Sequence, residues 1–160
     1  MNLLLGIGND LLGDDGIGCR VADQWCHPDW TSYIAGTVPE NFTRTIREIN
    51  PHTLVLVDAA RMNLSPGTIR IIPQDRVADT GIGTHQLPLD ALCDIVSRYC
   101  EKIIIIGIQP ENIGIGEEMS HSVKEAGKDL LSLLADGTYG NLPVFGETSH
   151  LGVGMMADKE

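Results

Sequence analysis

Two aspartates and one histidine combine the residue types and the positions expected of a metal site. Asp15 lies in a glycine-rich segment after the first apolar run, and Asp58 directly follows the apolar run Leu54–Val57. A charge at the end of a buried strand is costly unless it is paired or bound to something. His85 lies between glycines and Pro88, near the expected start of a helix. Two carboxylates and one imidazole leave an open coordination position, which indicates a catalytic or transient site for zinc, nickel, manganese or cadmium.

Simpler roles for the aspartates stay open at this point. Asp14 and Asp15 would both suit the start of a helix, where capping and the helix dipole contribute roughly 0.5 to 2 kcal/mol. Only one residue is needed as a cap, and the sequence has two. Asp58 would also suit a loop anchor. The segment Gly6–Gly18 has some features of a dinucleotide-binding loop, but Leu11 stands where that motif needs glycine, which disfavours nucleotide binding.

The scaffold that must position these residues is an alternation of strands and helices. The expected strands are Leu3–Ile7, Thr31–Val38, Thr53–Val57, Gly67–Ile72 and Ile103–Ile108. The expected helices follow Asp14, Pro39 and Pro88, and the last runs from Ser120 to Leu134 with Gly137 ending it. This order predicts an α/β fold with a central, mainly parallel sheet of about five strands. Ligands of such sheets gather at the carboxyl ends of the strands, where all three candidate residues are expected.

Composition narrows the function classes. The chain has 160 residues, 42% of them hydrophobic, and a formal net charge of -11. This charge repels nucleic acid and anionic lipid, so neither is expected as a partner. The amino terminus lacks the features of a signal peptide and no apolar stretch reaches the ~20 residues that span a bilayer, so we expect a cytoplasmic protein without membrane insertion.

The four cysteines form two pairs, each spaced seven residues apart. They are Cys19 with Cys26 and Cys93 with Cys100. On helices this spacing would place each pair on one face, so we expect buried, small hydrophobic side chains. A disulfide or a metal role is the lesser alternative.

Several ordered segments resemble a known family, the maturation endopeptidases of [NiFe] hydrogenases, and most closely the peptidase branch of the formate-hydrogenlyase (hydrogenase 3) type. The segments are Gly8–Gly18, Val38–Asn41, Val55–Ala59, Ser65–Gly67, Thr84–Leu89 and Ile106–Pro110. Together they extend from Leu3 to about Leu134. The resemblance implies that residues 1–137 form a peptidase domain, a single three-layer α/β domain of the phosphorylase/hydrolase-like kind with a twisted, mainly parallel five-stranded sheet flanked by helices. Residues 138–160 mix glycine, methionine and charge without a sustained period, so we expect an irregular carboxy-terminal tail there.

The resemblance also implies an activity. Members of this family remove the carboxy-terminal extension of a hydrogenase large-subunit precursor after nickel has been inserted. The family's metal-contacting triad falls on Asp15, Asp58 and His85, with aspartate at position 15 where other branches have glutamate. Asp15 and Asp58 are the implied catalytic residues, nickel is carried by the precursor, and other divalent metals could occupy the site. The protein is expected to act as a monomer.

Two mechanisms and a second function stay open. In one mechanism nickel docks the cleavage site and the metal or a carboxylate activates water; in the other, two carboxylates act as general acid and base and nickel is only recognised. The substrate-binding candidates are Asn9, Glu40, Asn41 and Gln109, which hydrogen bonding within loops and caps would explain equally well. The alternative function is a non-catalytic metallochaperone or precursor-binding module on the same scaffold.

Overall fold

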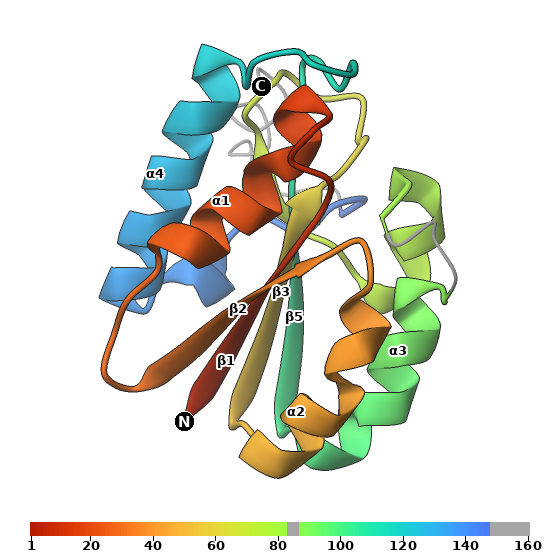
Figure 1. The fold of residues 1–160 in the computed structure, drawn as a ribbon, viewed down its shortest axis with the longest axis vertical. Helices are drawn as coiled ribbons and strands as arrows, with labels where there is room; N and C mark the ends of the chain where they lie inside the picture. The colour runs from red at the N-terminus through yellow and green to blue at the C-terminus, as the bar shows by residue number, and fades with distance from the viewer. Residues whose placement is uncertain (83–86, 148–160) are drawn as a thin grey trace.

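A five-stranded sheet forms the middle layer of the protein. The computed structural model describes residues 1–82 and 87–147. The strand order is β2 (Trp30–Gly36), β1 (Asn2–Ile7), β3 (Thr53–Ala59), β5 (Lys102–Ile108) and β4 (Ile69–Ile71). The first four strands are parallel, and only β4 runs antiparallel to its neighbour β5 (Figure 1). The predicted α/β class and the mainly parallel sheet are therefore confirmed.

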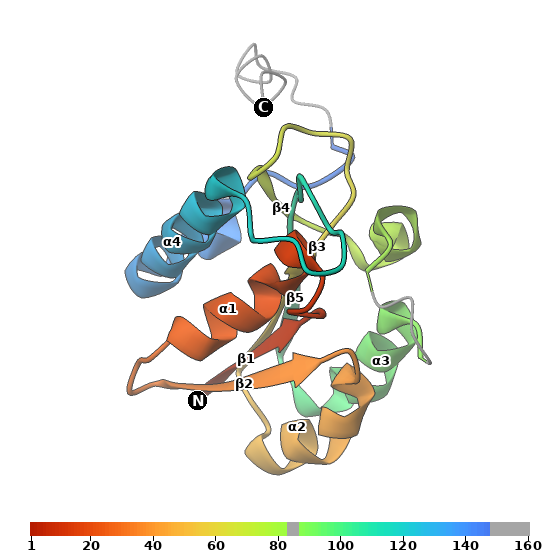
Figure 2. The ribbon, with the colours of Figure 1, turned by 45° about the horizontal axis from the view of Figure 1, so that its top comes forward.

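Helices cover both faces of the sheet. The α-helices are α1 (Ile17–Gln24), α2 (Thr43–Ile49), α3 (Leu89–Val96) and α4 (His121–Asp136). Short 3-10 helices are η1 (Gly13–Gly16), η2 (Pro39–Phe42), η3 (Gln74–Thr80), η4 (Ser97–Tyr99) and η5 (Tyr139–Asn141). Helices α1 and α4 share one hydrophobic cluster on one face, and α2 and α3 share another on the opposite face (Figure 2). This is the expected three-layer arrangement, because each of the four α-helices packs buried apolar side chains against the sheet.

Some local expectations were wrong. Ile95 and Cys26 are exposed, and Cys26 was expected on a buried helix face. The reason for Cys26 is that α1 ends at Gln24, so Cys19 and Cys26 do not share a helix. Arg70 of β4 is only 6% exposed. All four cysteines are free thiols, of which Cys19 and Cys93 have the predicted buried position.

The region after α4 continues in contact with the sheet. Glycine in the left-handed conformation at Gly137 ends the helix, as expected. Beyond η5, Ile71 of β4 donates to the Pro143 carbonyl and accepts from the Phe145 amide, so this segment lies along the outer edge of β4. Of the tail expected over 138–160, only residues 138–147 lie within the described part of the chain.

Helix α1 approaches the sheet closely through Gly18. A methyl group on Gly18 would lie 2.2 Å from the Val57 carbonyl oxygen and 2.4 Å from that of Ile7. Because both contacts are with backbone atoms, the helix would have to move. We expect Gly18→Ala to lower the free energy of unfolding by about 2 to 4 kcal/mol in urea titrations. Gly140→Ala is the matched control, since no atom lies within 4 Å of its added methyl group, and an equal loss in both variants would contradict this packing.

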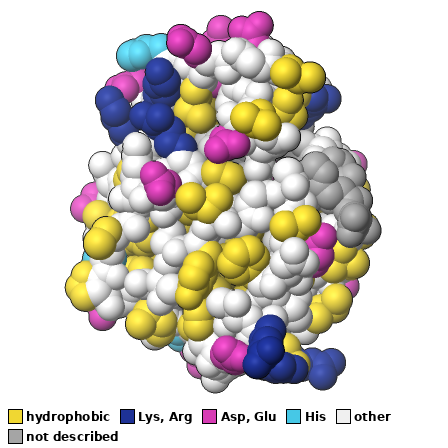
Figure 3. All heavy atoms as spheres, viewed as in Figure 1, with side chains coloured by type: hydrophobic (Ala, Val, Ile, Leu, Met, Phe, Trp, Pro, Cys, Tyr) yellow, Lys and Arg dark blue, Asp and Glu magenta, His cyan; other side chains and the backbone are white. Residues whose placement is uncertain are grey.

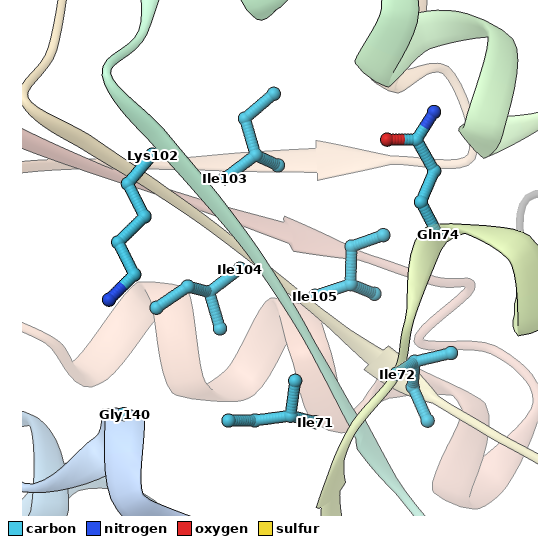
Figure 4. A pocket seen from close by; sticks show the side chains of 8 residues that line it. All are labelled: Ile71, Ile72, Gln74, Lys102, Ile103, Ile104, Ile105 and Gly140. Carbon is cyan, nitrogen blue, oxygen red and sulfur yellow. The ribbon is translucent and has the colours of Figure 1, made fainter. Parts of the chain in front are cut away.

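A second feature of the sheet is a small hollow at its amino end. Strand β4 pairs only with the last part of β5, so residues 102–104 of β5 have no strand beside them on that side. Figure 4 shows the isoleucine side chains of β5 and β4 that line this hollow of about 250 Å³. It lies at the end of the sheet opposite Asp58.

None of the described helices is long and apolar enough to cross a membrane.

Candidate active site

The two predicted aspartates meet at the carboxyl end of the central strands. Asp58 is the next-to-last residue of β3 and is 6% exposed, and its Oδ1 accepts the Ala59 amide at 2.7 Å. Asp15 lies in η1, is half-buried, and its Oδ2 accepts the Asn9 amide at 2.8 Å. The loop after β1 and the end of β3 therefore bring together carboxylates that are 43 positions apart in the chain.

A glycine makes this approach possible. Gly8 has a φ of +135°, and a Cβ there would lie 2.0 Å from the Asp15 carbonyl oxygen and 3.2 Å from Asp58 Oδ1. Any other residue would be strained in this conformation and would collide with the backbone of the site. Gly8 thus sets the spacing between the two aspartates.

Asp58 carries the clearest electrostatic signature of the site. Burial and, secondly, the neighbouring Asp15 carboxylate raise the pKa of Asp58 well above its ordinary value, and the Ala59 amide only partly opposes them. Carboxyls with strongly raised pKa values beside a second carboxylate are typical of acid–base sites. In the free protein Asp58 therefore stays protonated at pH values where an exposed aspartate is ionised.

Asp14, next to Asp15, has a structural role that sequence reasoning missed. Its side chain is completely buried and accepts four hydrogen bonds of 2.7 to 2.9 Å. The donors are the amides of Glu111, Asn112 and Ser120 and the Ser120 hydroxyl. Ser120 is the N-cap residue of α4, so Asp14 joins the site loop to the loop before that helix. The signal in the sequence was the second aspartate, one more than a helix cap needs.

Cys19 lies under the site but is unsuited to nucleophilic chemistry. Its thiol is buried and lies 3.4 Å from the Gly8 carbonyl oxygen. Burial raises the pKa of the Cys19 thiol to about 11, and the negative charges of Asp58 and Asp15 act in the same direction. The thiol therefore stays protonated at neutral pH, which disfavours Cys19 as a nucleophile.

The four predicted substrate-binding residues have different surroundings. Asn9 closes its own turn by accepting the Leu11 amide at 2.9 Å. The side chain of Gln109 accepts the Met62 amide at 2.7 Å and donates to the Pro110 carbonyl, so it holds two loops together. Asn41 is exposed. Their role toward a substrate stays a prediction.

Glu40 differs from the other three. It is the second residue of η2, just after β2, and its Oε1 is buried without a hydrogen-bond partner among the described residues. A buried carboxylate oxygen without a partner costs free energy unless a ligand or water satisfies it. This makes Glu40 the member of the set with unused binding capacity.

His85, the third predicted metal ligand, lies outside the described residues. Within residues 1–82 and 87–147, no group of three histidine, cysteine, aspartate or glutamate side chains is arranged to hold a metal ion. Asp15 and Asp58 provide oxygen ligands suited to a divalent cation, and a complete site would need a further ligand.

Comparison with known proteins identifies the family of this chain. The family described as HycI, hydrogenase maturation protease, matches residues 28–136. The hydrogenase 3 maturation protease of Escherichia coli strain K12 is 36% identical over 144 residues, which cover 88% of this chain and 92% of that protein. This chain belongs to the hydrogenase maturation protease family. The resemblance inferred from the sequence is thereby confirmed, and the protein is a peptidase that acts in hydrogenase maturation.

Solved structures place the protease in the same fold family. The solution structure of the endopeptidase HycI from Escherichia coli has a TM-score of 0.82 and 33% identity, covering 91% of this chain and 97% of its own. The [NiFe] hydrogenase maturation protease HycI from Thermococcus kodakarensis has a TM-score of 0.76 and 30% identity, covering 86% and 91%. The protease shares their sheet and helices over nearly the full length of each.

Proposed function

We propose that this protein removes the carboxy-terminal extension of a [NiFe] hydrogenase large-subunit precursor after nickel insertion. The observation that carries the proposal is that Asp15 lies near Asp58. Burial and the charge of Asp15 together raise the pKa of Asp58. Membership of the protease family supplies the reaction class, hydrolysis of a peptide bond. The two aspartates are the groups at this end of the sheet that can hold and move protons.

The raised pKa of Asp58 favours a mechanism in which Asp15 acts as the general base and Asp58 as the general acid. Asp15 takes a proton from the attacking water, while protonated Asp58 gives its proton to the scissile carbonyl oxygen. When the tetrahedral intermediate collapses, the C–N bond breaks, the amine leaves with the proton from Asp15, and Asp58 recovers its proton from the hydroxyl group. The protons balance over one turnover.

In the alternative mechanism, nickel carried by the substrate docks the cleavage site at the two aspartates. We propose Asp15, Asp58 and His85 as its contacts, because a divalent cation offsets the repulsion between two buried carboxylates. Binding a cation at Asp58 requires loss of its proton, so the affinity for the nickel-loaded precursor rises with pH. A purely acid–base role of Asp58 predicts instead that the cleavage rate falls with rising pH, because Asp58 then loses the proton that it must donate. The pH dependence of KM and of kcat, measured separately, therefore distinguishes the two mechanisms.

The decisive experiment is an incubation of purified protein with the nickel-loaded precursor, followed by mass spectrometry. We expect the precursor to lose mass and a carboxy-terminal peptide to appear, with little cleavage of nickel-free precursor. Binding without a released peptide would overturn the proposal in favour of a precursor-binding module. Asp129→Asn, an exposed change on α4, serves as the control that should cleave at the unaltered rate.

A further inference from the structure

The outer edge of β2 is open in the described part of the chain. Strand β2 is the terminal strand of the sheet and pairs only with β1. The other terminal strand, β4, is covered by the hydrogen bonds of Ile71 with Pro143 and Phe145. Among residues 1–82 and 87–147, the chain thus covers one edge of its sheet and leaves the other without a partner strand.

The register identifies the backbone groups that face outward. The Asn2 amide donates to the Asp29 carbonyl and Asn2 to Gly6 pair in register with Trp30 to Ile34, so Thr31 and Tyr33 direct their amides and carbonyls toward β1. The alternate residues Ser32 and Ile34 direct theirs away from the sheet. These donors and acceptors are available to an added strand.

The sequence of β2 lacks the usual protection of an open edge. Edge strands commonly carry lysine, proline or other charged residues that prevent pairing with another chain. Strand β2 reads Trp-Thr-Ser-Tyr-Ile-Ala-Gly, with no charged residue and no proline. Ile34 is 50% exposed and Tyr33 is 39% exposed. Figure 3 shows hydrophobic side chains at the surface across the middle of this face, where β2 lies in Figure 1.

Two hollows border this edge and lead toward the aspartates. One, of about 370 Å³, lies beside Trp30, Ser32 and Ile34. The other, of about 640 Å³, shares Ile34 and Asp23 with the first and extends to Gly13 and Gly16, which flank Asp15. A chain segment placed along β2 would therefore continue to the loop that carries the proposed catalytic residue.

The charge of the larger hollow selects the kind of segment that fits. Its charged lining comprises four acidic residues and two basic ones: Asp10, Asp23, Glu117 and Glu118 against Arg20 and Lys124. With the net charge of -11 on the whole chain, this surface attracts a segment with basic side chains.

We propose that the open edge of β2 binds an extended, basic segment of the precursor as an added strand. The inference rests on the proposed function, because that function supplies a protein substrate. Backbone hydrogen bonds at Ser32 and Ile34 would give affinity, and the side-chain hollows on the α1 side would give specificity. The added strand would align the chain with Asp15 and Asp58.

The first test replaces an outward-facing amide. Ile34→Pro removes that donor without breaking the ladder to β1, since proline is tolerated at outward positions of edge strands. We expect kcat/KM on the precursor to fall at least about tenfold, mainly through KM, which corresponds to about 1.4 kcal/mol, the size of one or two net hydrogen bonds. Ile34→Ala keeps the amide and is the matched control, with an expected loss under about threefold. Equal effects of the two substitutions would overturn the proposal.

A second measurement needs no substitution. Amide hydrogen exchange in the unaltered protein should slow at Ser32 and Ile34 when the precursor is added, whether or not cleavage occurs. Unchanged exchange at both amides would overturn the added strand, while release of the peptide would still support the proposed function. Slowing that depends on the concentration of this protein alone would also overturn it, because a second copy would then occupy the edge.

A third variant tests the charge of the segment. Asp23→Lys changes an exposed residue that both hollows share. We expect its KM for the precursor to rise several-fold at low salt and less at high salt. An unchanged KM would overturn the choice of a basic segment.

Discussion

Replacing Asp58 with asparagine is expected to abolish processing of the precursor and to stabilise the free protein at neutral pH. Processing should fall at least about 100-fold, the usual contribution of a positioned acid or base. Stability should rise by about 1 to 2 kcal/mol, as is common when a strained functional group is replaced. Asparagine still offers an oxygen to the Ala59 amide and adds no charge beside Asp15.

The pH dependence of stability separates this effect from general repacking. An unfolded aspartate loses its proton near pH 4, whereas the folded pKa of Asp58 is raised. The stability that protonated Asp58 contributes is therefore fully present below about pH 4 and is lost as the pH rises toward the folded pKa. Asparagine does not titrate, so the advantage of Asp58→Asn in urea unfolding should grow between about pH 4 and pH 7. Parallel stability curves for the two proteins would contradict the assignment, and Asp129→Asn should show no such divergence.

Substitutions of the adjacent residues Asp14 and Asp15 should have different effects, the first on stability and the second on activity. Asp14→Ala is expected to lower the free energy of unfolding by about 3 to 5 kcal/mol, because it leaves three amides and one hydroxyl of the loop between β5 and α4 without their buried acceptor. Asp15→Asn keeps an oxygen for the Asn9 amide. We expect its stability to stay within about 1 kcal/mol of the unaltered protein, while processing falls at least about 100-fold.

Denaturant titration and the peptide-release assay on both variants check this pair. A conservative Asp14→Asn variant should recover part of the lost stability, since one amide oxygen still accepts from the loop. If Asp15→Asn unfolded the protein and Asp14→Ala left it intact, the roles assigned to the two residues would be reversed.

Much of the fold followed from local patterns. The runs in the centre of the sheet are almost entirely apolar, as is typical of strands that are covered on both faces, so the sequence predicted them as buried strands. Leu130 and Leu134 likewise recur at helical spacing and lie buried on α4. Exposure at element ends was harder, since Cys26 and Ile95 depend on where a helix stops and what packs beside it.

The site could be predicted only in part. Asp58 was identifiable because a carboxylate directly follows an apolar strand, and Asp15 because it lies in the loop after the first strand. The role of Asp14 could not be predicted, because its hydrogen-bond partners Glu111, Asn112 and Ser120 are about 100 positions away in the chain. No local pattern encodes such a contact.

By itself, the sequence determined the residue types of the site, the alternation of strands and helices, and the segments that mark the protease family. Tertiary structure alone decided which of two neighbouring aspartates holds loops together and which faces Asp58. It also decided that β2 lies at an open edge while Pro143 and Phe145 cover β4. The physical reason is that burial, pKa and edge exposure depend on which segments meet in space, and those meetings join residues far apart in the chain.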